Sequence, residues 1–285
     1  MKHKRHIIKQ NHHARFTSPK KLKYFEEQDK ALLEREQLLD DKERMLKTNM
    51  NLLEDTLHEI RKINNQIKSN VYHLNNAIQD LYFEDEDLAK FVNNTLKTIE
   101  GNSTLLSIRM NAFDILFDPA SASKELELMI GVYSKVEKVY KCLYPSKKKK
   151  NLEIFLNGGS NKEFRLRSSI EIAFFIIIEN AIKYSPEGEK IDIFFYETQN
   201  GLNVKFCNWA ICPKEEEFER LTERGFRSNN VANIKEYEGR GIGLYLMKEI
   251  CETNNVGYLL NKEQNTKNIF GTNYHQFVVT LYFYD

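Results

Sequence analysis

The chain has 285 residues, a formal net charge of +1, 41% hydrophobic residues, 12 glycines and 5 prolines. This composition excludes an intrinsically disordered chain and suffices for buried cores in two domains with an extension. The balanced charge gives no indication of a nucleic-acid partner, and we expect none. No apolar run reaches the roughly 18 residues that span a bilayer, so we expect a cytoplasmic protein without a transmembrane segment.

Residues 1–24 form a basic segment that contains eight Lys and Arg residues and no acidic one. Such a segment can attract an anionic membrane or nucleic acid. The simpler interpretation, which we favour, is a flexible solvated tail. The four cysteines of the chain, Cys142, Cys207, Cys212 and Cys251, form no CxxC pair. We therefore expect reduced thiols rather than disulfides or a zinc site.

A long helix is predicted from residue 25 to residue 81. Apolar residues recur every seventh position, as Leu32, Leu39, Leu46, Leu53, Ile60, Ile67, Leu74 and Leu81, and a second series runs through Met50, Leu57, Val71 and Ile78. This heptad pattern is typical of a coiled coil. Asn64 occupies one seam position, where a single Asn can fix register and oligomer state. We expect a parallel homodimer in which Asn64 pairs with Asn64 of the second copy.

A helical hairpin follows from the break in this pattern. The acidic stretch Phe83–Asp87 predicts a turn, a second helix is expected from Leu88 to Phe117, and Asp118-Pro119 ends it. Two copies of such a hairpin form a four-helix bundle. Residues 25–120 are thus predicted to be a coiled coil and dimerisation hairpin.

Residues 121–285 mix the two kinds of element. We expect helices over 126–143, 218–221 and 243–253, and strands over 152–156, 163–166, 191–197, 202–207 and 277–283. Asn200-Gly201 between two of these strands is a strong hairpin signal. The predicted fold class is therefore α+β, in which an α/β sandwich with helices on one face of a mixed sheet follows the long helices.

Two motifs in this second domain point to a nucleotide. The apolar run Ile170–Ile178 leads into Glu179, Asn180, Lys183 and Tyr184, which come at the end of one helix. Polar groups there need partners, because the helix enters the core. About sixty residues later Gly239-Arg240-Gly241-Ile242-Gly243-Leu244 forms a glycine loop that opens a helix, which is a ready anion site.

The stretch Glu179–Ser185 resembles the N box of the GHKL ATPases, most closely that of sensor histidine kinases. Residues 239–244 resemble their G2 box, residues 223–228 the F-box part of their ATP lid, and Gly271-Thr272 with the final strand their C-terminal hairpin. The resemblance covers residues 121–285 and implies a Bergerat fold that binds ATP and Mg²⁺.

The resemblance also implies roles for single residues. Asn180 would hold Mg²⁺, Lys183 and Arg227 would contact phosphate, and Tyr184 would pack on the adenine. Backbone amides of the glycine loop would bind the phosphates. Asn208 stands where the family places an Asp that accepts from the adenine amino group, and Ile176 stands where it often has a second Asn.

The first helix carries the candidate phosphoacceptor. Leu57-His58-Glu59-Ile60-Arg61 resembles the H box of histidine kinases, and the heptad register places His58 outside the seam. Glu59 could take a proton from the imidazole and so free a ring nitrogen for attack. His73 is a rival acceptor that lacks an adjacent acid, and we favour His58. Lys62 replaces the Thr or Asn that serves the phosphatase reaction in the family.

Three functions compete. The leading prediction is a two-component protein-histidine kinase that autophosphorylates on His58 and passes the phosphate to a response regulator receiver domain. The second is a degenerate kinase acting as a non-catalytic dimeric module, which Asn208, Ala210 and Ile176 favour. The third is a GHKL ATPase with Glu179 as base.

Overall fold

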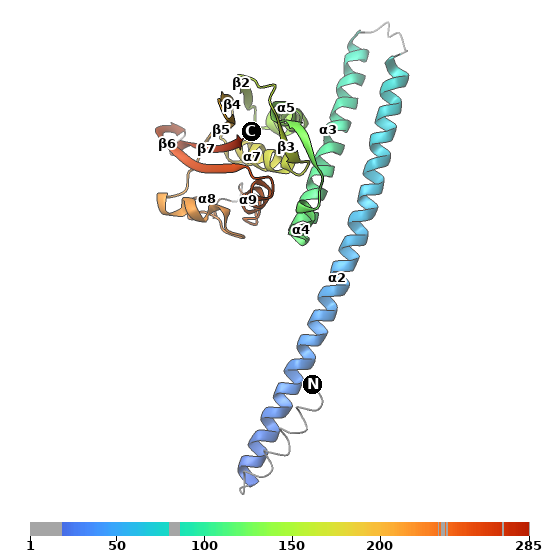
Figure 1. Cartoon of the computed structure of the whole chain (residues 1–285), viewed down its shortest axis with the longest axis vertical. Helices are drawn as coiled ribbons and strands as arrows, with labels where there is room; N and C mark the ends of the chain where they lie inside the picture. Colours follow the sequence, from blue (N-terminus) through green and yellow to red (C-terminus); the bar gives the residue numbers. More distant parts are fainter. Residues whose placement is uncertain are drawn as a thin grey trace. The chain divides into compact units, whose positions relative to one another are not determined.

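The computed structural model describes residues 19–79, 86–232, 234, 237, 239–269 and 271–284 (Figure 1). By its internal contacts the chain divides into two compact units, residues 1–60 and 61–285. This division falls inside the first long helix, α2 (Pro19–Gln79). The boundary that the sequence places at residue 120 stays a prediction.

The two long helices of the N-terminal half have the predicted bounds within a few residues. α2 is mostly exposed, and α3 runs from Glu86 to Phe117, followed by the short α4 (Pro119–Ser123). Residues 19–24 of the predicted basic tail are helical and belong to α2. Residues 1–18 and 80–85 lie outside the described residues, and with them Leu81 and the first three residues of the predicted turn Phe83–Asp87.

Asn64 is satisfied within the chain, which makes the predicted pairing with Asn64 of a second copy wrong. Its side chain is 1% exposed. Its amide Nδ2 donates to the carbonyl oxygen of Ser103 on α3 at 2.9 Å and to Ser107 Oγ at 2.8 Å. Its Oδ1 accepts from Ser103 Oγ at 2.6 Å. Because donor and acceptor are both used, Asn64 joins α2 to α3 rather than chain to chain.

Polar contacts extend this junction on both sides of Asn64. Lys68 Nζ donates to Ser107 Oγ at 2.8 Å, one turn further along α2. Arg61 forms an ion pair with Asp114 of α3. The residues of α2 that belong to the second unit are therefore tied to α3 by hydrogen bonds as well as by apolar packing.

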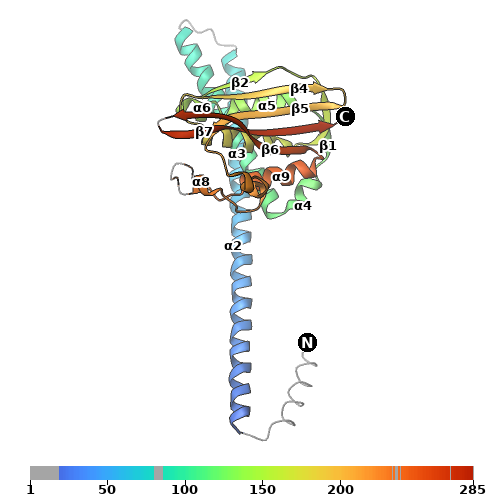
Figure 2. The same ribbon diagram turned by 90° about the vertical axis from the view of Figure 1, so that its left-hand side faces the viewer.

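The second unit contains two sheets. β1 (Glu127–Gly131) and β3 (Glu163–Arg167) form a two-stranded antiparallel sheet. The larger sheet has the order β2 (Glu153–Asn157), β4 (Lys190–Thr198), β5 (Gly201–Ala210), β7 (Thr272–Tyr284) and β6 (Gly257–Ile269). Only the β2–β4 pair is parallel. Figure 2 views this sheet face on, with its strands stacked in that order.

Helices cover one face of the five-stranded sheet. α7 (Ile170–Tyr184) lies on β5, with α5 (Val132–Cys142) and α9 (Gly243–Thr253) on its two sides. Buried and more exposed side chains alternate along β4, since Ile191, Ile193 and Phe195 are buried while the residues between them are not. Such alternation is typical of a strand with one face against a core. The remaining helical pieces are α6 (Tyr144–Lys149), η1 (Glu215–Thr222) and α8 (Asn229–Ala232).

Two sequence expectations for this unit need correction. The helix predicted over 126–143 begins only at Val132, because the preceding residues pair with β3 as β1. The C-terminal hairpin is longer than the predicted strand 277–283, since β6 and β7 each contain 13 residues. The α+β class itself, with long helices followed by a mixed sheet, is confirmed.

In the part of the chain that the structure describes, none of the helices is both long and apolar enough to cross a membrane. All four cysteines are free and buried. Burial raises the pKa of Cys207 to about 11, and that of Cys212 and Cys251 to about 12, so these thiols stay protonated at neutral pH.

Candidate nucleotide-binding site

Helix α7 supplies one wall of the site. It is buried from Ile172 to Ile178. Apart from Glu171 in the first turn, its polar side chains lie in the last turns, where Asn180, Lys183 and Tyr184 share a face. Lys183 Nζ lies 5.1 Å from the centre of the Tyr184 ring. Burial raises the pKa of Tyr184, with Arg227 acting against it, so the phenol stays neutral.

The glycine loop forms the opposite wall and touches this polar turn. A Cβ atom built on Gly239 would lie 3.1 Å from Lys183 Nζ, and one built on Gly243 would lie 3.8 Å from Asn180 Nδ2. The same added Cβ on Gly243 would lie 3.4 Å from Cγ2 of Ile176. The position where the family often has a second Asn is therefore apolar and packed beside the loop.

At position 241 of this loop only a glycine fits. Its φ is +66°, and an added Cβ would lie 2.4 Å from the carbonyl oxygen of Phe226. The Gly225 amide donates to the Gly241 carbonyl at 2.9 Å. The glycine loop and the predicted lid segment are thus in close backbone contact, with no room for a side chain between them.

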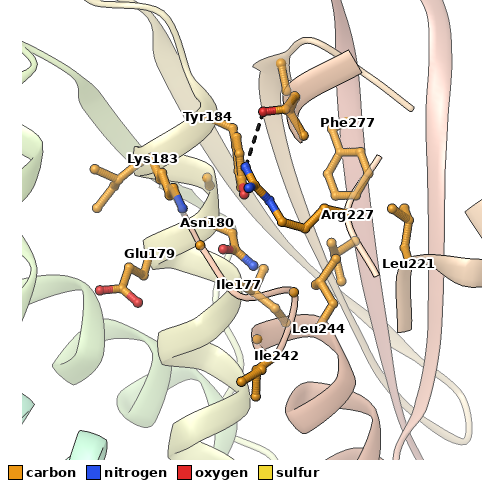
Figure 3. A pocket seen from close by; sticks show the side chains of 18 of the residues that line it. Ile177, Glu179, Asn180, Lys183, Tyr184, Leu221, Arg227, Ile242, Leu244 and Phe277 are labelled. Atoms are coloured by element: carbon orange, nitrogen blue, oxygen red, sulfur yellow. Dashed lines mark hydrogen bonds between the residues drawn. The ribbon is translucent and has the colours of Figure 1, made fainter. Parts of the chain in front are cut away.

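The lid segment places Arg227 at the cavity (Figure 3). Arg227 Nη2 donates to the carbonyl oxygens of Tyr237 at 2.7 Å and Val231 at 3.2 Å. Its Nε is buried without a hydrogen-bond partner in the described part of the chain. The rings of Tyr237 and Tyr184 lie 5.1 Å apart. A guanidinium group at the wall of a cavity is suited to an anionic ligand.

Asn208 occupies the position that the family gives to the base-reading Asp. It is 6% exposed and lies on β5. Its Nδ2 donates to Ser185 Oγ at 3.3 Å and to the Trp209 carbonyl oxygen at 3.2 Å. Both bonds use the amide nitrogen, so Oδ1 is the atom left to accept from a ligand.

These walls enclose one cavity of about 890 Å³, within the usual size range of small-molecule sites. All twelve residues predicted to bind the cofactor line it: Glu179, Asn180, Lys183, Tyr184, Asn208, Arg227, Gly239, Arg240, Gly241, Ile242, Gly243 and Leu244. Their contacts with a nucleotide stay a prediction.

Sequence reasoning missed one wall of the cavity. Arg109, Phe113 and Leu116 of α3, and Ser146 of α6, also line it. Arg109 lies 5.5 Å from the ring centre of Phe175 and forms an ion pair with Glu179. The carboxylate of Glu179 is therefore directed at α3, and Figure 3 shows it pointing away from Arg227. Only the three-dimensional packing of α3 on α7 brings these residues to the site.

A metal ion would have few protein ligands here. The described residues contain no group of three or more His, Cys, Asp or Glu side chains that could hold one. Asn180 lines the cavity with its Nδ2 nearest the glycine loop, and its Oδ1 is the atom that could bind a metal ion. This donor set fits Mg²⁺, which usually keeps its waters and binds through a few protein oxygens together with substrate phosphates.

The predicted phosphoacceptor lies in the first unit. His58 and Glu59 are exposed on α2, and His73, further along the same helix, is exposed as well. The structure thus groups the nucleotide-site residues in one cavity and describes His58 and Glu59 separately from it. Exposure does not separate His58 from His73 as acceptor.

Comparison with known proteins gives the following relatives. None of the protein-family models matches the chain. Histidine protein kinase SaeS of Staphylococcus aureus, in strains USA300 and Newman among others, is 26% identical over 133 residues, 46% of this chain. The match covers 38% of the relative, so the chain spans little more than a third of the curated relatives that it matches.

The solved structures found by comparison are named as histidine kinases, and each has a TM-score below 0.5 with this chain. The mycobacterial sensor histidine kinase MprB has a TM-score of 0.43 at 15% identity, covering 56% of this chain and all of that one. Acinetobacter baumannii histidine kinase AdeS has a TM-score of 0.42 at 16% identity, with coverage of 80% and 97%. Full-length ShkA in complex with AMPPNP has a TM-score of 0.46 at 14% identity, with coverage of 82% and 46%.

Proposed function

We propose that this chain, which is homologous to histidine protein kinases over 133 residues, is an ATP-dependent protein-histidine kinase of a two-component system. The observation that carries the proposal is the convergence of α7, the glycine loop, the lid arginine and Asn208 on one cavity. A cation-lined end and an end with a buried amide acceptor suit the phosphates and the base of one nucleotide.

The residues of the cavity would position ATP. Lys183, Arg227 and the amides of the glycine loop would hold the phosphates, and Tyr184 and Asn208 would hold the adenine. Asn180 would hold Mg²⁺, which when bound neutralises phosphate charge during transfer. Phosphoryl transfer asks mainly for such positioning and charge stabilisation, so these groups match the chemistry.

The proposed transfer uses the histidine of α2. A neutral ring nitrogen of His58 attacks the γ-phosphorus of ATP, the bond to the β,γ-bridging oxygen breaks, and ADP leaves. Glu59 takes the proton from the other ring nitrogen. The phosphoryl group then passes to an aspartate oxygen of a response regulator receiver domain, and His58 is regenerated. We propose that the acting form is a homodimer through α2 and α3.

A specific observation favours a second function. Ile176 packs beside the glycine loop, at the position where the GHKL proteins often have a second Asn near the metal ion. Asn208 is a neutral residue at the position where these proteins have an Asp that binds the base. These features suit a non-catalytic dimeric module that binds nucleotide or a partner. An ATPase with Glu179 as base is disfavoured, because the carboxylate is paired with Arg109.

Incubation with γ-labelled ATP and Mg²⁺ separates the three functions. A kinase yields acid-labile, base-stable label on the protein. An ATPase yields free phosphate alone, and a module yields neither. Light scattering on the same preparation tests the homodimer, and a stable monomer at micromolar concentration would contradict it.

A further inference from the structure

Lys150 does not line the cavity, yet its side chain forms three hydrogen bonds with the end of α7. It is the last of four consecutive lysines and follows α6 directly. Its Nζ donates to the carbonyl oxygens of Ile182 at 3.1 Å, Lys183 at 2.7 Å and Ser185 at 2.6 Å. An ammonium group has three N–H donors, so the three carbonyls match its full capacity.

These carbonyls lie at the C-terminus of α7, where backbone oxygens lack helical partners and the helix dipole is negative. A positive donor at this position is favourable for both reasons. The backbone of Lys150 is fixed too, since its carbonyl oxygen accepts from the Gly188 amide at 3.1 Å. Lys150 thus joins the end of α7 to the connection between α6 and β2.

The turn that Lys150 holds contains the residues that would contact the base. Tyr184 lies between two of the bonded carbonyls in sequence and faces the cavity. Ser185 Oγ donates to the Ala181 carbonyl at 2.6 Å and accepts from Asn208 Nδ2 at 3.3 Å. This second bond orients the Asn208 amide so that Oδ1 remains as the acceptor.

We propose that Lys150 is a positioning residue that sets the adenine preference of the site. It acts through the last turn of α7, which fixes the Tyr184 ring and, through Ser185, the orientation of the Asn208 amide. The inference rests on the proposed function, because it assumes a nucleotide in this cavity. Asn208 Oδ1 would accept from the adenine amino group, whereas guanine presents a carbonyl at the matching position.

The test measures ADP and GDP affinity by calorimetry for the wild type, Lys150→Met and the control Lys149→Met. Lys149 is an exposed neighbour in the same lysine run. We expect Lys150→Met to weaken ADP binding about tenfold, because the last turn of α7 then no longer fixes Tyr184 and Asn208, and to lower the ratio of ADP to GDP affinity severalfold. Lys149→Met should leave both values within about twofold, because a solvated surface lysine contributes little.

A purely structural cap would lower the melting temperature without changing the ratio of ADP to GDP affinity, so an unchanged ratio in Lys150→Met overturns the inference. If Lys150→Met does not fold, the milder Lys150→Gln decides by the same ratio. Ser185→Ala, which cuts the link to Asn208 and leaves Lys150 intact, should lower the ratio in the same direction. If the wild type binds neither ADP nor ATP, the proposed function fails instead.

Discussion

Helices α7 and α2 are both long apolar-striped helices, but they present their functional residues in opposite ways. α7 is buried on nearly all sides, and apart from Glu171 in its first turn its polar residues lie in its last turns. α2 is exposed along most of its length, and His58 and His73 are two exposed histidines among many polar side chains. A polar group on a buried helix must have a partner, whereas one on an exposed helix needs none.

This difference decides how far each site can be assigned. Around α7, backbone contacts and hydrogen bonds limit the positions of Asn180, Lys183 and Asn208, so the cavity is defined in detail. On α2 no comparable constraint acts on His58. The following predictions test whether the nucleotide site is as tightly constrained as this contrast requires.

The largest effect on nucleotide affinity is expected at Gly241. Gly241→Ala places a Cβ about 2.4 Å from the Phe226 carbonyl oxygen at a positive φ, so the glycine loop and lid must separate. We expect nucleotide affinity to fall at least tenfold, which corresponds to about 1.4 kcal/mol or more. Gly271→Ala is the matched control, because Gly271 has a φ of +81° and no atom within 4 Å of the added Cβ. It should cost stability only, about 1 kcal/mol, and leave calorimetric affinity unchanged.

Asn64→Leu tests the polar junction between α2 and α3. Removing the amide takes away the acceptor at 2.6 Å from the buried Ser103 hydroxyl. We expect the free energy of unfolding to fall by about 2 kcal/mol, the usual cost of an unsatisfied buried group. Asn65→Leu, at an exposed neighbour, should change it by less than about 0.5 kcal/mol. If Asn64→Leu instead raises the melting temperature, the hydrogen bonds of Asn64 contribute less to stability than apolar packing at the same position.

Glu217 gives the lid a pH dependence. Burial raises the pKa of this carboxyl, but hydrogen bonds from the Asn229 amide, the Ser228 hydroxyl and the Lys214 amide outweigh it and hold the pKa below its usual value. A lowered folded-state pKa means that the stabilisation is present above the unfolded-state pKa and is lost as pH falls through the folded-state value.

Glu217→Gln should therefore lower the free energy of unfolding by about 1 kcal/mol at pH 7. Three donors point at the carboxylate, and Gln replaces one of its two acceptor oxygens with an NH₂ donor. The difference from the wild type should shrink below about pH 4. Glu216→Gln, at an exposed position, serves as control. Chemical unfolding at several pH values measures the effect, and a difference that stays constant with pH would exclude an ionised Glu217 as its cause.

The smallest effect is expected for Asn208→Asp. A carboxylate accepts more strongly from an adenine amino group, but it also meets the Trp209 carbonyl oxygen, to which the amide now donates. These effects oppose each other, so we expect ATP affinity by calorimetry to change by less than about threefold. A gain of tenfold or more would mean that the site is a weakened form of the family pattern rather than one rebuilt around the amide.

Much of this architecture could be predicted from the sequence, for reasons that particular residues make clear. The apolar run of α7 and the glycines at 239, 241 and 243 act locally, so the main walls of the cavity were predictable. β1 was not, because Leu128 and Met129 become a strand only by pairing with β3. β6 was not predicted either, because it is a polar strand at the edge of the sheet and forms by pairing with β7.

The missed parts of the site have the same origin. Arg109 and Phe113 reach the cavity through the packing of α3 on α7, which no local pattern encodes. Lys150 belongs to a lysine run that reads as a solvated surface, and its three backbone partners lie more than 30 positions away. The sequence predicts that Asn64 is buried, but it does not distinguish partners on α3 from a second Asn64.

The most direct test of the central claim compares His58→Ala with His73→Ala after incubation with γ-labelled ATP and Mg²⁺. We predict acid-labile, base-stable label on the wild type and on His73→Ala, and none on His58→Ala. Calorimetric ATP affinity should stay within a few-fold in both variants, because the cavity contains neither residue. Label that persists on His58→Ala and disappears from His73→Ala would contradict the phosphoacceptor assignment, and a wild type that binds ATP but is never labelled would contradict the kinase itself.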